Sequence, residues 1–345
     1  MPETASKLVQ LPALFRKNGC LLHLHVDLTL RCPLDCPHCY VAGPRSRDGE
    51  MSTQEVLAVL EQAHELKGFF LLISGGEPML RPDFFEILEA AHRMRFALRV
   101  KTTGLYLREP EARRLASLAP IQVDLSIHGA TPETHDRFVG MAGAFERAVR
   151  AFEALRKAGV YVGVRTNIVP DNLHETFEIE RRFDAPGVDY RRSLAVFSRR
   201  DGVPLRDDLW LGEAACVSIL NPKDRSLPPP PDPRRPLCGA GATGLYVAPN
   251  GDVMPCSLWP QRLGNVREEG LRGALERAAA IRRLVHADRS VCMGCPLRAV
   301  CAFCPGESVA EGRAPTDPNR VACGLARAEA RARGLDDLEP ASEQG

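Results

Sequence analysis

A repeating alternation of strand-like and helix-like segments between residues 21 and about 200 constrains the fold of this chain most. Apolar, strand-like runs occupy 21–30, 69–74, 97–103, 121–128, 161–169 and 189–197. Segments with helical spacing of apolar residues separate them, the first opening on a capping box formed by Ser52 and Glu55. Strands that are mostly apolar are typical of a parallel sheet buried on both faces. Six such units are too few for a closed eight-unit barrel, so a doubly wound open sheet and a partial barrel both fit.

Short distinctive motifs follow the first four predicted strands. Three cysteines come after the first strand, SGGEP (74–78) after the second, KTTG (101–104) after the third and SIHG (126–129) after the fourth. In parallel α/β folds, ligands and catalytic groups collect at the C-terminal ends of the strands. The sequence therefore predicts the chemistry of this protein at that end of the sheet.

Three of the 12 cysteines in this chain of 345 residues form the pattern C-x3-C-x2-C, as Cys32, Cys36 and Cys39. A zinc site would need a fourth ligand, and His38 lies between two of the cysteines. A disulfide would leave one thiol over. An iron–sulfur cluster held by three thiolates would leave one iron open to a substrate or cofactor. The spacing favours the cluster, with zinc as the alternative.

The cysteine pattern, followed by the aromatic Tyr40, resembles the radical S-adenosylmethionine (SAM) superfamily, and the resemblance covers about residues 21–200. SGGEP is similar to the family's glycine-rich stretch, which contacts the methionine amino group of SAM. One departure is Thr103, which stands where many relatives carry asparagine. The positions that the resemblance assigns to SAM binding are Tyr40, Gly75, Gly76, Glu77, Ser126, Arg137 and Asn167.

The resemblance implies a partial (β/α)6 TIM-like barrel of the α/β class, with SAM and a [4Fe–4S] cluster as cofactors. Cys32, Cys36 and Cys39 would hold the cluster and be the catalytic cysteines. The open iron would bind the amine and carboxylate of SAM. One electron from the reduced cluster would then cleave SAM to methionine and a 5′-deoxyadenosyl radical, which abstracts a hydrogen atom. The protein would hold the cofactor, aim the radical and exclude water.

The cysteines near the C-terminus form a second pattern, which resembles the SPASM extension of radical SAM enzymes and implies two auxiliary [4Fe–4S] clusters. The resemblance groups Cys292, Cys295, Cys301 and Cys323 on one cluster, and Cys238, Cys256 and Cys304 on the other. The interval from Cys301 to Cys304 is x2 where x3 is usual. Cys216, a carboxylate such as Asp252, water or substrate could complete the second group. One or two structural zinc ions are the alternative, because paired C-x2-C motifs also suit zinc.

The domain organisation follows from these patterns. We expect an N-terminal extension (1–20), a radical SAM partial barrel (21–225), a proline-rich linker (226–237), a small cysteine-rich SPASM domain (238–334) and a frayed tail (335–345). Asn250 and Gly251 predict the turn of a β-hairpin within the SPASM domain, and short helices should complete it.

Composition narrows the partners and the compartment. The chain carries 45 basic and 44 acidic residues, a formal charge of +1, which gives no reason to expect nucleic acid or an anionic membrane. No apolar run is long enough to span a membrane, and the N-terminus lacks the features of a secretory signal. We therefore expect a cytoplasmic protein.

The most specific function that the sequence predicts is that of a radical SAM oxidoreductase which modifies a ribosomally made peptide or a protein. The product would carry a thioether, a carbon–carbon crosslink or an oxidised side chain. The expected partners are the precursor peptide or protein and an electron donor such as flavodoxin or ferredoxin. The alternatives are an enzyme like the anaerobic sulfatase maturases, a radical SAM enzyme of small-molecule cofactor biosynthesis and, more remotely, a non-catalytic binding protein stabilised by zinc.

Overall fold

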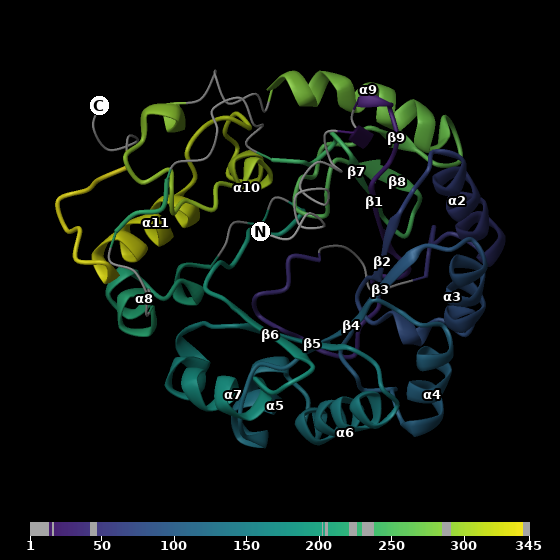
Figure 1. Ribbon diagram of the computed structural model, residues 1–345, viewed down its shortest axis with the longest axis horizontal. Helices are drawn as coiled ribbons and strands as arrows, with labels where there is room; N and C mark the ends of the chain where they lie inside the picture. The colour runs from purple at the N-terminus through teal and green to yellow at the C-terminus, as the bar shows by residue number, and fades with distance from the viewer. Residues whose placement is uncertain are drawn as a thin grey trace.

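A curved sheet of nine strands organises the protein (Figure 1). The computed structural model describes residues 14–15, 17–41, 47–201, 203, 206–220, 226–229, 238–284 and 291–340. The strand order is β6-β5-β4-β3-β2-β1-β7-β8-β9, and every pairing from β6 to β7 is parallel. The first six strands are β1 His23–Asp27, β2 Phe70–Ser74, β3 Ala97–Thr102, β4 Gln122–Ser126, β5 Val162–Asn167 and β6 Val188–Ser193. The sheet ends at β6 and β9 and does not close, so the predicted partial barrel is confirmed.

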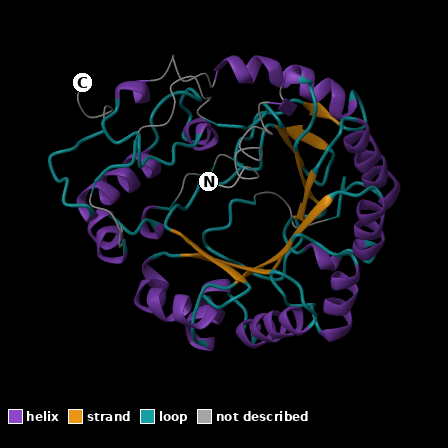
Figure 2. Ribbon diagram, in the orientation of Figure 1, coloured by secondary structure: helices purple, strands orange, loops and turns teal. Residues whose placement is uncertain are grey.

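Helices cover the outer face of this sheet (Figures 1 and 2). They are α2 Thr53–Glu65, α3 Phe84–Arg93, α4 Glu109–Ser117, α5 Pro132–Val139, α6 Ala144–Lys157 and α7 Thr176–Phe183. Short 3-10 turns lie at Pro78–Leu80 and Pro170–Glu175. The predicted capping box at the start of α2 is present, with the Ser52 hydroxyl accepting from the Glu55 N–H and the Glu55 carboxylate accepting from the Ser52 N–H.

The inner face of the sheet carries many polar side chains, which differs from the mostly apolar strands that the sequence suggested. β3 shows the reason most clearly: Leu98, Val100 and Thr102 are buried under the helices, while Arg99 and Lys101 are only partly covered. Side chains alternate between the two faces of a strand. The helix-facing residues build the core, and the inward residues line a cavity.

The predicted hairpin extends the barrel sheet. β7 (Gly244–Val247) pairs in parallel with β1, and β8 (Asp252–Met254) and β9 (Gly264–Asn265) follow in antiparallel order. Gly251 has a φ of +84° in the turn, a conformation that favours glycine. The hairpin therefore ties the start of the cysteine-rich region directly to the first strand.

The rest of the C-terminal region packs beside the open edge near β6 (Figure 1). It contains α8 (Glu213–Ile219), α10 (Pro305–Ala310) and α11 (Arg320–Ala332), with 3-10 turns at Asp207–Leu209 and Val291–Gly294. Helix α9 (Gly270–Leu284) lies at the opposite end of the sheet, against α2 and β9 (Figure 1). Glu307 is buried and accepts hydrogen bonds from the Ser198 N–H at 3.0 Å and hydroxyl at 2.8 Å. That contact joins α10 to the end of the barrel.

Both ends and the proline-rich stretch fall partly outside the described residues. Of the predicted extension 1–20, residues 1–13 and 16 lie outside, as do 230–237 of the linker and 341–345 of the tail. Leu335 and Leu338 of the tail pack against Leu297, Ala326 and Ala330. In the part of the chain that the structure describes, no helix is both long and apolar enough to cross a membrane.

Candidate active site

The three cysteines of the first motif lie together on the loop that follows β1. The Cys39 N–H donates to the Cys36 carbonyl at 3.1 Å, and the Asp35 N–H donates to the Val139 carbonyl at 2.8 Å. Burial raises the pKa of the Cys36 thiol, and Cys39 and Cys32 raise it further because they lie within electrostatic reach. If these neighbouring thiols lost their protons without a bound metal, the three thiolates would repel one another. They therefore fit a cationic iron–sulfur cluster, which deprotonates its thiols.

These thiols open into a cavity of about 860 Å³ on the inner side of the sheet. The walls come from the strand ends, and Ser74, Gly75, Gly76, Thr103, Ser126, His128 and Asn167 contribute to them. Tyr40 and Ser257 line the cavity on the side of the hairpin. The volume is within the range of small-molecule sites, about 300–1,000 Å³. The cavity therefore brings the cysteines and the motifs after strands two to four into one site.

Gly75 and Gly76 press the loop after β2 against the loop that leads to the cysteines. A Cβ on Gly75 would lie 2.4 Å from the Thr29 carbonyl oxygen, and one on Gly76 would lie 2.3 Å from that of Arg31. The Gly76 N–H donates to the Thr29 carbonyl at 2.7 Å. Glycine is required here because the two backbones approach too closely for a side chain. Both glycines present backbone to the cavity, in keeping with the contact that the sequence predicts.

Glu77 has a different position from the one expected of a direct SAM contact. Its side chain is fully buried and is absent from the described residues that line the cavity. The carboxylate accepts from the Met79 N–H at 3.0 Å, the Thr102 hydroxyl at 2.8 Å, and both the N–H and the hydroxyl of Thr103, at 2.7 and 2.5 Å. Burial raises the pKa of Glu77, and these donors act in the opposite direction. Glu77 therefore joins the loops after β2 and β3, and Thr103 is a partner in that joint.

The remaining predicted contacts separate into two groups. Tyr40, Ser126 and Asn167 line the cavity, and the Asn167 amide donates to the Ala195 carbonyl at 3.2 Å. Burial, with a smaller contribution from Asp27, raises the pKa of Tyr40 to about 12, so its hydroxyl stays protonated. Arg137 lies elsewhere: it is exposed on α5 and donates to the Asp171 carbonyl at 3.2 Å. The structure does not bring Arg137 to the cavity.

Three histidines lie next to one another near the cysteines: the half-buried His38 of the cysteine loop and the buried His128 and His135. His38 and His128 meet edge to face with ring centroids 4.7 Å apart, and His128 stacks on Phe138 at 4.6 Å. The Asn167 N–H donates to Nδ1 of His128, and the His128 N–H donates to Nδ1 of His135 at 3.0 Å. Burial lowers the pKa of His38 and of His135 to about 4. A ring nitrogen that accepts a backbone N–H cannot carry a proton, so His128 and His135 are neutral.

We expect the change of His135 to asparagine to weaken the pH dependence of folding stability. The pKa of His135 is about 4 when folded and about 6.5 when unfolded, so its contribution is present above pH 6.5 and is lost as the pH falls toward 4. Between pH 7 and pH 5 this histidine should cost the wild type about 2 kcal/mol of unfolding free energy. Urea denaturation at both pH values measures the effect. His64→Asn, at an exposed position, is the control, and an equal loss in wild type and H135N would contradict the expectation.

The cysteines of the second pattern fall into the two groups that the resemblance implies. Burial, then Cys238 and Cys304, raise the pKa of Cys256 to about 12. Burial, then Cys323, Cys292 and Cys295, raise that of Cys301 to about 12. These electrostatic contacts join residues of the same group only. Among the described residues, no three His, Cys, Asp or Glu side chains lie close enough together to hold a single metal ion.

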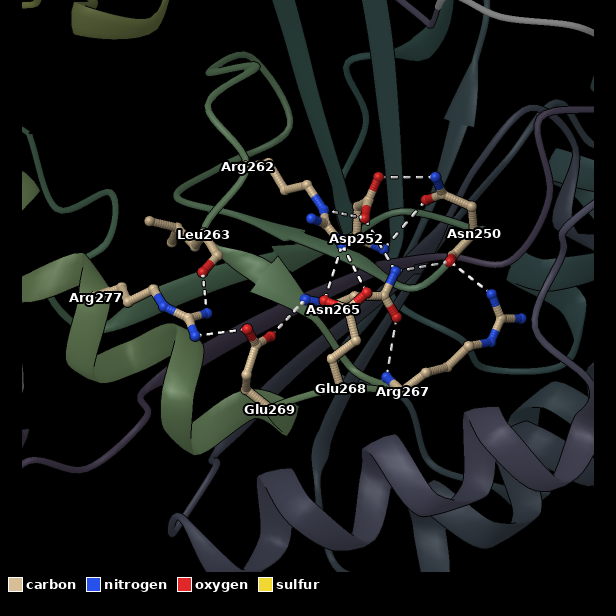
Figure 3. A network of polar contacts seen from close by, with 9 residues as sticks. All are labelled: Asn250, Asp252, Arg262, Leu263, Asn265, Arg267, Glu268, Glu269 and Arg277. Atoms are coloured by element: carbon tan, nitrogen blue, oxygen red, sulfur yellow. Dashed lines mark hydrogen bonds and ion pairs between the residues drawn. The ribbon is translucent and has the colours of Figure 1, made fainter.

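Neither suggested protein ligand for the second group, Cys238, Cys256 and Cys304, is placed to complete it. The Asp252 carboxylate accepts from Arg262 at 2.6 Å and from Asn265 at 3.0 Å (Figure 3). The network continues through Glu269 to Arg277 of α9 (Figure 3). Arg267 extends it to Glu55 of α2. Although burial opposes it, hydrogen bonding lowers the pKa of Asp252. Cys216 is fully buried in α8, where burial and Glu213 raise the pKa of its thiol to about 11. The contacts of Asp252 with Arg262 and Asn265 thus anchor the hairpin.

Sequence comparison matches two families to this chain. Residues 26–182 match the radical SAM superfamily, and residues 238–296 match the SPASM iron–sulfur cluster-binding domain. The chain is 30% identical over 321 residues to an AdoMet-dependent heme synthase from Methanosarcina barkeri, a match that covers 82% of this chain and 91% of that protein. It is 34% identical over 262 residues to the mycofactocin maturase MftC of Mycobacterium tuberculosis, covering 67% of this chain but only 63% of the maturase.

A third relative and two solved structures extend the comparison. The chain is 30% identical over 257 residues to the PqqA peptide cyclase of Gluconobacter oxydans, covering 68% of this chain and 70% of the cyclase. Streptococcus suis SuiB bound to S-adenosylmethionine has a TM-score of 0.68 at 17% identity, over 90% of this chain and 80% of SuiB. SuiB bound to its precursor peptide SuiA gives 0.66 at 16% identity, over 94% and 81%. At these identities the structures establish a shared fold.

Proposed function

This chain belongs to the radical SAM superfamily of enzymes, with a SPASM iron–sulfur domain, and we propose that it oxidatively modifies a precursor peptide. The observation that carries the proposal is the cavity, where three thiols face the strand-end motifs. When bound there, SAM and the cluster supply one-electron cleavage and hydrogen-atom abstraction. MftC is named as a maturase and the PqqA cyclase as acting on a peptide, and SuiB is solved with a precursor peptide.

The roles of the residues follow from their places in the cavity. Cys32, Cys36 and Cys39 hold the catalytic cluster in this proposal, and the backbone of Gly75 and Gly76 accommodates the amino group of SAM. Tyr40, Ser126 and Asn167 face the rest of the cofactor. Glu77 does not line the cavity but holds the loops after β2 and β3 together. Cys292, Cys295, Cys301 and Cys323 hold one auxiliary cluster, and Cys238, Cys256 and Cys304 hold the other.

The electron donor and the compartment are part of the same proposal. Reductive cleavage consumes one electron, which a flavodoxin or ferredoxin would deliver. Cysteine-ligated clusters need reduced thiols, and the cytoplasm maintains them. A cytoplasmic enzyme supplied by such a donor fits both requirements.

We expect the peptide product to be lighter than its substrate by two hydrogens, with one 5′-deoxyadenosine and one methionine formed per event. After hydrogen abstraction the substrate radical must lose one electron and one proton, the proton to solvent, to reach a closed-shell product. An auxiliary cluster held by the C-terminal cysteines would supply an electron acceptor, because ligands and burial tune its potential. The assay combines the reduced holoenzyme, SAM and a precursor peptide encoded beside its gene, read by mass spectrometry. A product of unchanged mass, or one carrying an added methyl group, would rule out the oxidative reaction.

A second candidate is a small-molecule substrate of the tetrapyrrole type. The match to the heme synthase covers 82% of this chain, whereas that to MftC covers 67%, so it extends further along the chain. The peptide assay discriminates between the two candidates, because only a peptide-modifying enzyme converts the precursor.

A further inference from the structure

A layer of ionisable side chains crosses the inner face of the barrel below the cysteines. The pairing register aligns Lys101 of β3 with Asp124 of β4, Asp124 with Gly163 of β5, and Gly163 with Asp189 of β6. On the other side of Lys101, Val100 pairs with Ile73, and Ser74 pairs with Asp27 of β1. Four parallel strands thus bring one lysine and three aspartates to nearly the same level.

Each of the three aspartates already has a cationic partner. Asp27 pairs with Arg200 at 3.3 Å and with His25 at 2.9 Å, which together lower its pKa to about 2 although burial opposes this. Asp124 pairs with Arg99 at 2.5 Å and with Arg165 at 2.8 Å.

Arg165 continues to the third carboxylate, Asp189, at 2.5 Å. The absence of a side chain at Gly163 makes room for this arrangement, because a Cβ there would lie 2.0 Å from Oδ1 of Asp124 and 2.8 Å from the Arg165 guanidinium. Each aspartate of the layer is therefore ion-paired with a cation other than Lys101, and only Oδ1 of Asp124 among their buried oxygens lacks a hydrogen bond within the described residues.

Lys101 is the cation of this layer that lacks a contact. Within the described residues its ammonium group makes no hydrogen bond and no ion pair within 4 Å, and the residue lines the cavity. Burial lowers the pKa of Lys101, while Asp124 raises it and Arg99 and Arg165 lower it again. With Arg99, Arg165 and Arg200, four cations face three carboxylates. Burial of an ammonium group is costly unless an anion pairs with it.

Five of the six basic residues that line the cavity already have carboxylate partners. Arg165 pairs with Asp124 and Asp189, Arg191 with Asp189, Arg192 with Glu180, Arg199 with Asp201 and Arg206 with Asp208. The sixth is Lys101, which forms no such ion pair among the described residues. SAM does not provide the missing charge, because its carboxylate is expected on the open iron and its sulfonium is positive. A carboxylate on the second molecule in the cavity would provide a direct partner for this ammonium group.

We propose that Lys101 binds a carboxylate of the substrate and so determines which part of the substrate faces the cofactor. The proposal rests on the proposed function, since it takes this cavity as the active site. The carboxylate has two sources: an acidic side chain of a peptide, or a carboxylate on a flat small molecule. The chemistry at Lys101 is the same for both.

The test measures binding to the holoenzyme with its clusters and SAM in place. One probe pair is N-acetylglutamate N-methylamide with N-acetylglutamine N-methylamide, and the other is 3-phenylpropionate with 3-phenylpropionamide. Each pair differs only in the charge of the carboxyl group. Ligand-observed NMR gives the dissociation constants for the wild type, K101Q, K101R and K157Q. Lys157 is an exposed residue of α6, so K157Q controls for the loss of one positive charge.

We expect the wild type to bind the acid of at least one pair about tenfold more tightly than the amide. A preference of this size corresponds to one hydrogen bond between charged groups. K101Q should lose this preference, and K101R and K157Q should keep it. The pair with the larger preference identifies the source of the carboxylate. A wild type without preference, or K101Q that retains it, would overturn the proposal.

SAM affinity distinguishes a contact of Lys101 with the substrate from a contact with the cofactor. SAM affinity should be the same in K101Q and wild type, and a tenfold loss would assign Lys101 to the SAM site and overturn the proposal. Formation of 5′-deoxyadenosine by the reduced wild type tests the proposed function separately. The binding measurements need no turnover, so failure of one proposal is distinguishable from failure of the other.

Discussion

Simultaneous replacement of Cys32, Cys36 and Cys39 by alanine is expected to abolish SAM cleavage while the auxiliary iron stays bound. These three thiols lie together at the cavity, and the auxiliary cysteines form separate groups in the C-terminal region. Three [4Fe–4S] clusters contain about 12 irons, so the variant should retain about eight. Iron analysis and chromatography of 5′-deoxyadenosine after reduction measure the two effects.

The matched control for this variant is Cys20→Ala, because Cys20 lies outside all three groups and its thiol donates to the Asn18 carbonyl. It should retain both the iron and the cleavage activity of the wild type. Intact cleavage in the triple variant would refute the assignment of the catalytic cluster. A content of about four irons with tightly held zinc in the wild type would instead refute the auxiliary clusters.

The local elements of the barrel could be predicted from sequence because short-range patterns determine them. The capping box of Ser52 and Glu55 marks the start of α2, and the turn glycine Gly251 marks the hairpin. Five of the six strands lie within the predicted runs, and β6 begins at Val188, one residue before its predicted run. A helix cap or a tight turn depends on a few neighbouring residues, so its signal survives in one sequence.

The long-range arrangement could not be predicted in the same way. β7 pairs with β1 across more than 200 residues, and neither strand carries a signal for the other. The buried contact between Glu307 and Ser198 likewise joins two segments that are distant in the chain. The sequence predicted short helices in this region without bounds, whereas α9 has 15 residues and α11 has 13.

The candidate site was predicted better in its backbone than in its side chains. The order of the motifs identified the strand-end loops, and Gly75 and Gly76 lie in the cavity wall as a glycine-rich stretch requires. A motif does not reveal which way a side chain points, and so Arg137 was expected in a cavity that it does not reach. The sequence did carry a signal for the charged residues of the cavity. Lys101 in VKT and Arg165 in GVRTN are charged residues within strands, where alternate side chains point to opposite faces.

The substitution Glu77→Ala is expected to destabilise the protein by about 3–5 kcal/mol and to weaken SAM binding. Removal of the carboxylate leaves the Met79 and Thr103 N–H groups and two threonine hydroxyls without their acceptor in a buried position. Each unsatisfied buried group costs about 1–3 kcal/mol. The loops after β2 and β3 are then no longer held together. Gly75 and Gly76 lie in the loop after β2 and move with it. Urea denaturation and equilibrium SAM binding measure the two consequences.

Two companion variants make the reason for this loss testable. Glu77→Gln keeps the shape and one acceptor oxygen but directs amide hydrogens at donors, so its cost should fall between wild type and Glu77→Ala. Glu111→Ala removes a carboxylate that caps α4 by accepting from the Arg108 N–H at 3.0 Å near the surface, and it should cost about 1 kcal/mol with SAM affinity unchanged. If Glu77→Ala lost SAM affinity at full stability, Glu77 would instead contact the cofactor directly. The denaturation midpoint therefore decides whether this residue positions the loops or binds SAM.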